Sequence, residues 1–333
     1  MYNELVLSGG GIKGIAIIGS LSYLEDIHIL KNIKNYIGTS VGGFISFLLV
    51  VGFNCKELVD ISLNLDFNEY SDITLTNLIE TYGFDNFKKM GKIIIAIIKQ
   101  KGINKGITFE QLYQKTKKGL TITGSNISKG RLELFNKEKT PNMKVLIALQ
   151  ITMSIPIFFR PVLFNGFYYV DGGIYDPYPI KYANNIKKTL GIFLKKEENN
   201  ETNVVIDSLG SYMKHVLICF YNEFKEKILK SGKYKDSTII VDAESVSSIK
   251  FNLDKDDKNE IMNIGKDKSI KYIDNKFNKI RLAYLLKKNY IDKKRNNGNK
   301  VCMTIKKNGK RCQYLSKFTE NNKNYCGIHK NLL

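Results

Sequence analysis

The hydrophobic pattern of the first fifty residues alternates between short apolar runs and longer segments with helical spacing. Residues 4–8 form an apolar run that opens into three glycines, and residues 15–24 place apolar side chains at helical spacing. Tyr36 and Ile37 then lead into a second glycine-rich turn and a second apolar helix. Strands that alternate with helices in this way predict an α/β fold with a mainly parallel sheet.

The rest of the chain continues this mixture of elements. Residues 54–118 are largely helical in pattern, with interruptions near residues 68–71 and 101–106. The pattern then predicts, in order, a strand at 119–123, a polar turn at 124–126, a strand at 131–135, a helix at 143–150, and strands at 166–170 and 191–194. Further on it predicts a helix at 208–229, a strand at 237–241 and a helix at 256–278.

A polar, charged loop at residues 195–203 is the clearest internal boundary. It divides the chain into a main domain at 5–195 and a mostly helical C-terminal extension at 196–291, which we expect to pack on that domain. The last segment, 292–333, carries eleven Lys or Arg against two acids. This balance marks it as a separate basic tail.

Composition narrows the class of protein. The chain has 333 residues, of which 43% are hydrophobic, enough to bury a core, so global disorder is excluded. The net charge of +20 suits attraction to anionic lipid or nucleic acid, and it equally suits a solvated surface. Five cysteines do not make a disulfide framework in a chain of this size. No apolar stretch reaches the roughly 18 to 20 residues of a spanning helix, and the N-terminus lacks a secretory signal, so we expect a cytoplasmic protein without a transmembrane segment.

A serine lies in the second glycine-rich turn, where Gly38, Ser40 and Gly42 fit the pattern G-x-S-x-G. A serine held in a sharp strand-to-helix turn needs neighbours without a Cβ, so that the turn closes and the hydroxyl projects. The following helix points its positive N-terminus at the same place, which favours developing negative charge. Taken alone, the pentapeptide indicates a structural glycine turn more often than a nucleophile.

The first glycine-rich loop contains Gly9, Gly10, Gly11, Lys13 and Gly14, directly after the first strand. Its backbone N–H groups can cradle an anion, either an oxyanion or a phosphate, with Lys13 at the edge. The loop also fits G-x-G-x-x-G, but a dinucleotide site wants an acid at the end of a second strand, and residues 30–37 contain none. The dinucleotide interpretation therefore fails.

A serine nucleophile needs a base, and the chain offers few histidines. His215 could formally fill the histidine's place in a hydrolase triad, but its apolar helical context favours a structural role. His28 lies on the first predicted helix, and His329 belongs to the Cys/His tail described below. Asp171 offers a second answer, because Gly172 and Gly173 follow it and let its carboxylate approach another backbone closely. A carboxylate beside a serine can orient the hydroxyl and accept its proton. The alternative is a plain Asp-Gly turn.

The ordered motifs GGGIKG, GTSVG and DGG resemble those of patatin-like phospholipases, from about Leu5 to about Asn185. Residues 154–159 resemble the small-residue and proline segment that precedes the acid in that family, and residues 171–179 resemble its acid-bearing loop. The family usually has Arg where this chain has Lys13, which keeps the charge and loses the planar fork.

The resemblance implies a three-layer α/β/α sandwich that hydrolyses fatty acyl esters by a Ser–Asp dyad, without metal. It gives Ser40 the role of nucleophile, Asp171 that of general base, and the amides around Gly10 and Gly11 that of oxyanion hole. We therefore expect a serine esterase of the phospholipase A type that takes phospholipid or another acyl lipid at a membrane surface and needs no cofactor for catalysis. It would work in the cytoplasm (the host cytoplasm for a viral protein) and peripherally on membranes. The alternative is a catalytically weak or inactive lipid-binding protein with a nucleic-acid-binding tail.

The basic tail collects potential metal ligands in the spacing Cys302, Cys312, Cys326 and His329. Three thiolates and one imidazole suit tetrahedral zinc, so we expect a structural zinc ion here, with unliganded surface thiols as the alternative. The string resembles short Cys/His tails of proteins from large DNA viruses. A basic module of this kind suits an anionic membrane or a nucleic acid as partner. Cys55 and Cys219 lie in apolar contexts typical of buried thiols.

Overall fold

The computed structural model describes residues 1–64, 80–195, 232–242, 253–296, 318–320 and 323–325, together with a few single positions at 78, 206, 211, 212, 215, 216 and 219. The chain divides into two compact units, Met1–Lys271 and Tyr272–Leu333. In the second unit the described residues form the C-terminal part of a helix and a two-stranded antiparallel hairpin of β11 (Phe318–Glu320) and β12 (Lys323–Tyr325).

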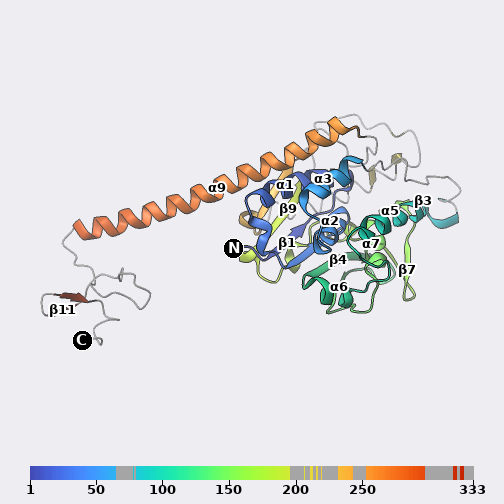
Figure 1. Cartoon of the computed structure of the whole chain (residues 1–333), viewed down its shortest axis with the longest axis horizontal. Coiled ribbons are helices and arrows are strands. Elements are labelled where there is room, and N and C mark those ends of the chain that lie inside the picture. The colour runs from blue at the N-terminus through green and yellow to red at the C-terminus, as the bar shows by residue number, and fades with distance from the viewer. Residues whose placement is uncertain are drawn as a thin grey trace. The chain divides into compact units, whose positions relative to one another are not determined.

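The first unit is built around one sheet with the strand order β10-β9-β1-β2-β4-β8-β7, and β5 also pairs with β4. Figure 1 labels β9, β1, β4 and β7 of this sheet. The strands are β1 (Glu4–Leu7), β2 (Asn35–Gly38), β4 (Gly119–Asn126), β5 (Arg131–Phe135), β7 (Val162–Phe164), β8 (Phe167–Asp171), β9 (Thr189–Lys195) and β10 (Thr238–Asp242). Pairing is parallel from β10 to β4 and antiparallel among β4, β5, β8 and β7. The predicted α/β fold with a mainly parallel sheet is confirmed.

The central strands are apolar on both faces because both faces are covered. Helices α1 (Gly14–Asp26), α2 (Val41–Val50) and α7 (Val145–Met153) pack along the sheet, and α2 contacts both α1 and α7. Val6, Ile37 and Phe193 lie on the opposite face, under the short 3-10 helix η4 (Pro179–Tyr182). The helix α9 (Lys255–Asn296) contacts α1 in its N-terminal part, where Ser20 Oγ donates a hydrogen bond of 2.9 Å to the Gly265 carbonyl.

The segment predicted to be largely helical contains α3 (Cys55–Asn64), α5 (Lys88–Lys99) and α6 (Phe109–Thr116), and also a strand, β3 (Gly83–Asp85). β3 pairs in parallel with β6 (Ile157–Phe159), and the paired residues are 74 positions apart in the chain. A three-residue strand buries too few side chains to show a period of two, so the hydrophobic pattern does not reveal it. The predicted helix at 208–229 and the predicted boundary loop at 195–203 lie largely outside the described residues and remain predictions. Lys195, the first residue of that loop, is the last residue of β9.

One predicted turn is wrong. Gly124, Ser125 and Asn126 belong to the end of β4 and are buried, and the chain turns at 127–130 instead. These small polar residues look like a turn in the sequence, yet the fold needs them inside the sheet. A Cβ at Gly124 would come within 2.6 Å of Ile151, and the Ser125 hydroxyl bonds to the backbone of β8.

Candidate functional site

Ser40 lies between the end of β2 and the start of α2, in a backbone conformation that L residues rarely adopt (φ 55°, ψ −129°). The turn is closed by glycine, because a Cβ at Gly42 would come 2.5 Å from the carbonyl oxygens of both Leu7 and Ser8. A Cβ at Gly38 would overlap the backbone of Gly42. The G-x-S-x-G pattern therefore forms a tight strand-to-helix elbow with a strained serine at its tip.

Hydrogen bonds tie this elbow to three other elements. The Ser40 amide donates to Thr152 Oγ1 at the end of α7 (2.8 Å), so that amide is already engaged. The Thr39 amide donates to the Leu7 carbonyl at the end of β1 (3.3 Å). The Thr39 hydroxyl lies 2.8 Å from the Thr123 hydroxyl and donates to the Asp176 carbonyl (3.1 Å), which joins the elbow to β4 and to the loop after β8.

Asp171 ends β8 and is held from both sides of its backbone. Its amide donates to the Ser154 carbonyl (2.8 Å), and its own carbonyl accepts from Ser125 Oγ (2.8 Å). Its Oδ1 accepts from the Gly173 amide (2.6 Å). A Cβ at Gly172 would overlap the side chain of Thr123, so a larger residue would push the acid loop away from the elbow.

Ser40 and Asp171 are brought together and are almost entirely buried, with exposed fractions of 6% and 5%. Burial raises the pKa of Asp171 from 3.8 to about 7, and the hydroxyl of Ser40 and the Gly173 amide hold it from rising further. Among the described residues Asp171 Oδ2 makes no hydrogen bond of standard geometry. A carboxylate with a pKa near neutrality is a far better proton acceptor than an ordinary aspartate.

The first glycine loop lies against the elbow. The Gly9 amide donates to the Pro177 carbonyl (2.9 Å), and Gly11 adopts a left-handed conformation (φ 55°). A Cβ at Gly14 would overlap the side chain of Val41, the residue that follows the serine. Lys13 is buried at the last position of the 3-10 turn Gly11–Lys13, where it is the N-cap of α1, and its amide donates to the Gly10 carbonyl (3.2 Å).

Backbone amides at this junction are available to an anion. In the part of the chain that the structure describes, the amides of Gly10, Gly11 and Val41 donate to no protein group. Amides from a loop and from the residue after a nucleophile are the donors that stabilise an oxyanion in strand–elbow–helix hydrolases. The sequence pointed to Gly9, Gly10, Gly11, Lys13 and Gly14, but the amides of Gly9, Lys13 and Gly14 already donate to protein carbonyls. The sequence analysis did not propose Val41, although its place after the serine in the G-x-S-x-G motif was a usable signal.

Other predicted groups lie elsewhere. His215 Nδ1 lies 2.8 Å from the Ser211 carbonyl one helical turn earlier, as expected of a structural histidine. Cys302, Cys312, Cys326 and His329 lie outside the described residues, so the zinc site remains a prediction. Within the described residues no three His, Cys, Asp or Glu side chains gather as a metal site. Cys55 is buried as expected, whereas Cys219 is exposed, contrary to the prediction.

Comparison with known proteins agrees with this geometry. A model of the family described as patatin-like phospholipase matches residues 5–184. The chain is 33% identical over 274 residues to the uncharacterized protein R571 of Acanthamoeba polyphaga mimivirus, covering 79% of this chain and 90% of that protein. It is 34% identical over 199 residues to the probable lipid hydrolase 463L of Invertebrate iridescent virus 6, covering 56% of this chain and 66% of that one.

Among solved structures, VipD from Legionella pneumophila superposes with a TM-score of 0.58 at 17% sequence identity. The match covers 82% of this chain and 67% of VipD, and it shows that the fold is shared. None of the described helices is long and apolar enough to cross a bilayer.

Proposed function

The chain belongs to the patatin-like phospholipase family, and on that basis we propose that it hydrolyses fatty acyl esters of phospholipids with Ser40 as nucleophile and Asp171 as general base. The observation that carries this proposal is the buried carboxyl group, with a pKa of about 7, beside a serine on a strained elbow. Strain of this kind persists at functional sites because the surrounding structure over-determines it.

The proposed reaction has two halves. Asp171 accepts the proton of Ser40 as Oγ attacks the ester carbonyl, and the amides of Gly10, Gly11 and Val41 bind the oxyanion that forms. Asp171 then returns the proton to the departing alcohol oxygen, leaving an acyl group on Ser40. A water molecule, deprotonated by Asp171, attacks this acyl-enzyme. As the bond between the acyl group and Ser40 Oγ breaks, Asp171 returns the proton to Oγ, and the fatty acid is released. Side chains and backbone amides carry every step, so the mechanism uses no metal or cofactor.

The direct test is fatty acid release from mixed phospholipid vesicles. We expect the wild type to release fatty acid and Ser40→Ala to lose at least about a thousandfold in turnover. Ser46→Ala is the matched control, because Ser46 is a buried serine of α2, the helix that follows Ser40, and its hydroxyl has no hydrogen-bond partner among the described residues. Circular dichroism checks that both variants fold. Release by Ser40→Ala at the wild-type rate would refute the dyad, and absence of release by every protein would favour the lipid-binding alternative.

We further propose that the enzyme takes its substrate at a membrane surface. Ile127, Tyr168 and Leu163 align across neighbouring strands: the Ile127 amide donates to the Tyr168 carbonyl, and Leu163 pairs with Tyr168 in the β7–β8 register. Their exposed fractions are 49%, 48% and 60%. Lys129 lies exposed beside this row and suits anionic headgroups. Arg131 is also exposed and pairs with Glu133 at 3.0 Å. Tyr168 precedes Asp171 by three residues on β8, which is about 10 Å along a strand.

The apolar row can be tested separately from the chemistry. Leu163→Ser should lower fatty acid release from anionic vesicles by about tenfold and leave hydrolysis of a soluble short-chain ester unchanged. Ile27→Ser is the matched control, because Ile27 is also exposed but directly follows α1, and it is not part of the row formed by Ile127, Tyr168 and Leu163. An equal loss on both substrates would show that Leu163 serves folding or catalysis and not membrane contact.

A further inference from the structure

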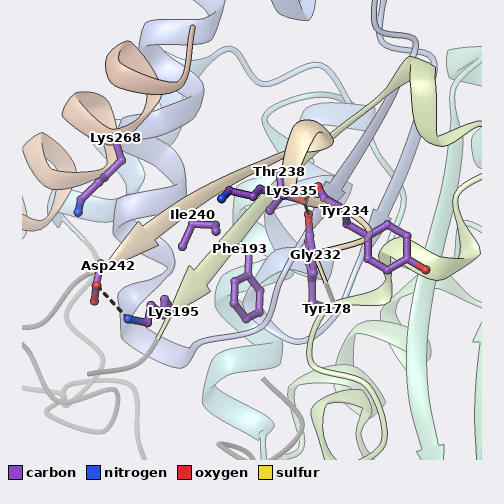
Figure 2. A pocket seen from close by; sticks show the side chains of 10 residues that line it. All are labelled: Tyr178, Phe193, Lys195, Gly232, Tyr234, Lys235, Thr238, Ile240, Asp242 and Lys268. Atoms are coloured by element: carbon purple, nitrogen blue, oxygen red, sulfur yellow. Dashed lines mark hydrogen bonds and ion pairs between the residues drawn. The ribbon is translucent and has the colours of Figure 1, made fainter. Parts of the chain in front are cut away.

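A cavity of about 480 Å³ opens at the β9–β10 edge of the sheet (Figure 2). Its volume is that of a small-molecule site. We call it the lysine pocket, and its lining residues are Tyr178, Phe193, Lys195, Gly232, Tyr234, Lys235, Thr238, Ile240, Asp242 and Lys268. Neither Ser40 nor Asp171 lines it, so the proposed ester chemistry gives it no role.

Three cations reach this pocket from three separate elements. Lys195 ends β9, Lys235 begins the 3-10 helix η6 (Lys235–Ser237) and Lys268 lies on α9. Lys195 Nζ lies 3.7 Å from Asp242 Oδ2, which is the carboxylate in the lining. Among the described residues no acid pairs with Lys235 or Lys268. The lining therefore carries an excess of positive charge, and bringing an anion among these ammonium groups relieves their mutual repulsion.

The floor of the pocket is aromatic. The rings of Tyr178 and Phe193 pack with their centroids 4.9 Å apart, and the Tyr178 hydroxyl is already bonded to Thr238 Oγ1 (2.9 Å). Tyr234 and Ile240 are half-buried and add apolar wall. An inorganic ion would leave this apolar surface uncovered, whereas an organic group attached to the anion would bury it.

We propose that the lysine pocket binds a phosphate monoester carried on an organic group. A phosphate monoester carries close to two negative charges at neutral pH, which matches the unpaired ammonium groups. Lysine binds phosphate as a point charge on a flexible side chain. The three lysine side chains can therefore move to contact the phosphate, and they need no fixed bidentate geometry of the kind that arginine provides. The same chemistry occurs in soluble phosphate esters and in lipids with a terminal phosphate, and the two sources are separable by experiment.

The test measures binding by isothermal titration calorimetry with inorganic phosphate, glycerol 3-phosphate and adenosine monophosphate, and by co-sedimentation with vesicles. The vesicles are phosphatidylcholine alone or phosphatidylcholine with phosphatidic acid. We expect a soluble organic monoester or the phosphatidic acid vesicles to bind more tightly than inorganic phosphate. Preference for the soluble ester identifies a metabolite site, and preference for the phosphatidic acid vesicles identifies a lipid site.

Two double variants separate a built site from general attraction by a basic protein. Lys235→Ala with Lys268→Ala should weaken binding at least about tenfold, since each removes a charge from the lining. Lys92→Ala with Lys99→Ala removes the same charge from exposed positions on α5 and should change binding less than about twofold. Equal weakening by both pairs, or no binding of any probe, would overturn the proposal.

Phosphate binding to the lysine pocket can be tested independently of ester hydrolysis. Ser40→Ala should bind the phosphate probe as the wild type does, because Ser40 is outside the lining. The Lys235→Ala, Lys268→Ala protein should hydrolyse a soluble ester within about twofold of the wild type, which also shows that it is folded. A dead enzyme that still binds phosphate would thus refute the proposed function and leave this proposal standing.

Discussion

The proposed dyad and the lysine pocket differ in how tightly the fold holds their side chains. At the dyad, glycines and buried threonines fix Ser40 and Asp171 through the backbone, with almost no space for adjustment. In the lysine pocket, the positive charges are ammonium groups on flexible lysine side chains, and the elements that carry them lie far apart in the chain. Bond formation requires atoms held within fractions of an ångström, whereas charge neutralisation tolerates movement. The two regions should therefore respond very differently to conservative substitutions.

The largest effect should come from the acid. Asp171→Asn removes the proton acceptor, and Asp171→Glu moves it by one methylene in a site without room, so both should lower turnover by about a thousandfold or more. Asp176→Asn is the matched control, because Asp176 is equally buried in the same loop and pairs with Lys181 at 3.0 Å. Its loss should stay below about tenfold on a soluble ester. Comparable losses at both positions would indicate that the loop, and not the base, is sensitive.

The pH dependence follows from the raised pKa of Asp171. Only the ionised carboxylate accepts the proton, so turnover should fall about tenfold per unit below pH 7 and level off above it. A pH–rate profile on a soluble ester measures this. A plateau that extends below pH 5 would contradict the buried base.

The raised pKa of Asp171 also predicts that the folded protein becomes less stable as the pH rises. Between about pH 4 and 7 the unfolded chain ionises this group while the folded chain keeps it protonated, so the wild type loses stability as the pH rises. Asp171→Asn removes that loss. Its melting temperature should exceed that of the wild type above pH 7, and the difference should shrink towards pH 4.

An intermediate effect should come from the elbow glycine. Gly42→Ala places a Cβ 2.5 Å from two carbonyl oxygens of the β1 segment, which should cost about 2 kcal/mol of unfolding free energy together with activity. Gly91→Ala is the contrasting control, since the added Cβ on α5 meets only Phe87 Cδ1 at 3.9 Å. Alanine there should stabilise the protein by up to about 1 kcal/mol. Denaturant unfolding of both variants measures the two changes in unfolding free energy, and equal effects at Gly42 and Gly91 would contradict this prediction.

The smallest effect should come from the pocket. Lys268→Arg keeps the charge on a flexible stem, so binding of the phosphate probe should change by less than about threefold. A loss as steep as that of Lys268→Ala would mean that the lysine is held as rigidly as the dyad, and the contrast between the two regions would fail.

The sequence predicted the elbow and the acid loop because their signals are local. Glycines beside Ser40 and after Asp171 are required by contacts within a few ångströms, and such requirements leave a readable pattern. The prediction of a turn at Gly124 and Ser125 was wrong because small polar residues are typical of turns. In this fold the two residues are buried in β4 beside Asp171. Local composition does not distinguish the two environments.

The lysine pocket had no signal in the sequence. Its cations are separated by forty and thirty-three residues and meet only because β9, η6 and α9 fold together. In a chain with 52 Lys and Arg, no single lysine stands out. Contacts of this kind become visible only in three dimensions.

The order of the strands along the chain determines when each part of the proposed site is synthesised. β1 and β2 emerge within the first forty residues and carry Ser40, whereas Asp171 follows about 130 residues later and β9 later still. At roughly 5 to 20 residues per second, the nascent chain carries the proposed nucleophile without its proposed base for on the order of 10 s. In the proposed mechanism a chain that has Ser40 but not yet Asp171 lacks its proton acceptor, so we expect it to hydrolyse no lipid until β8 has been made.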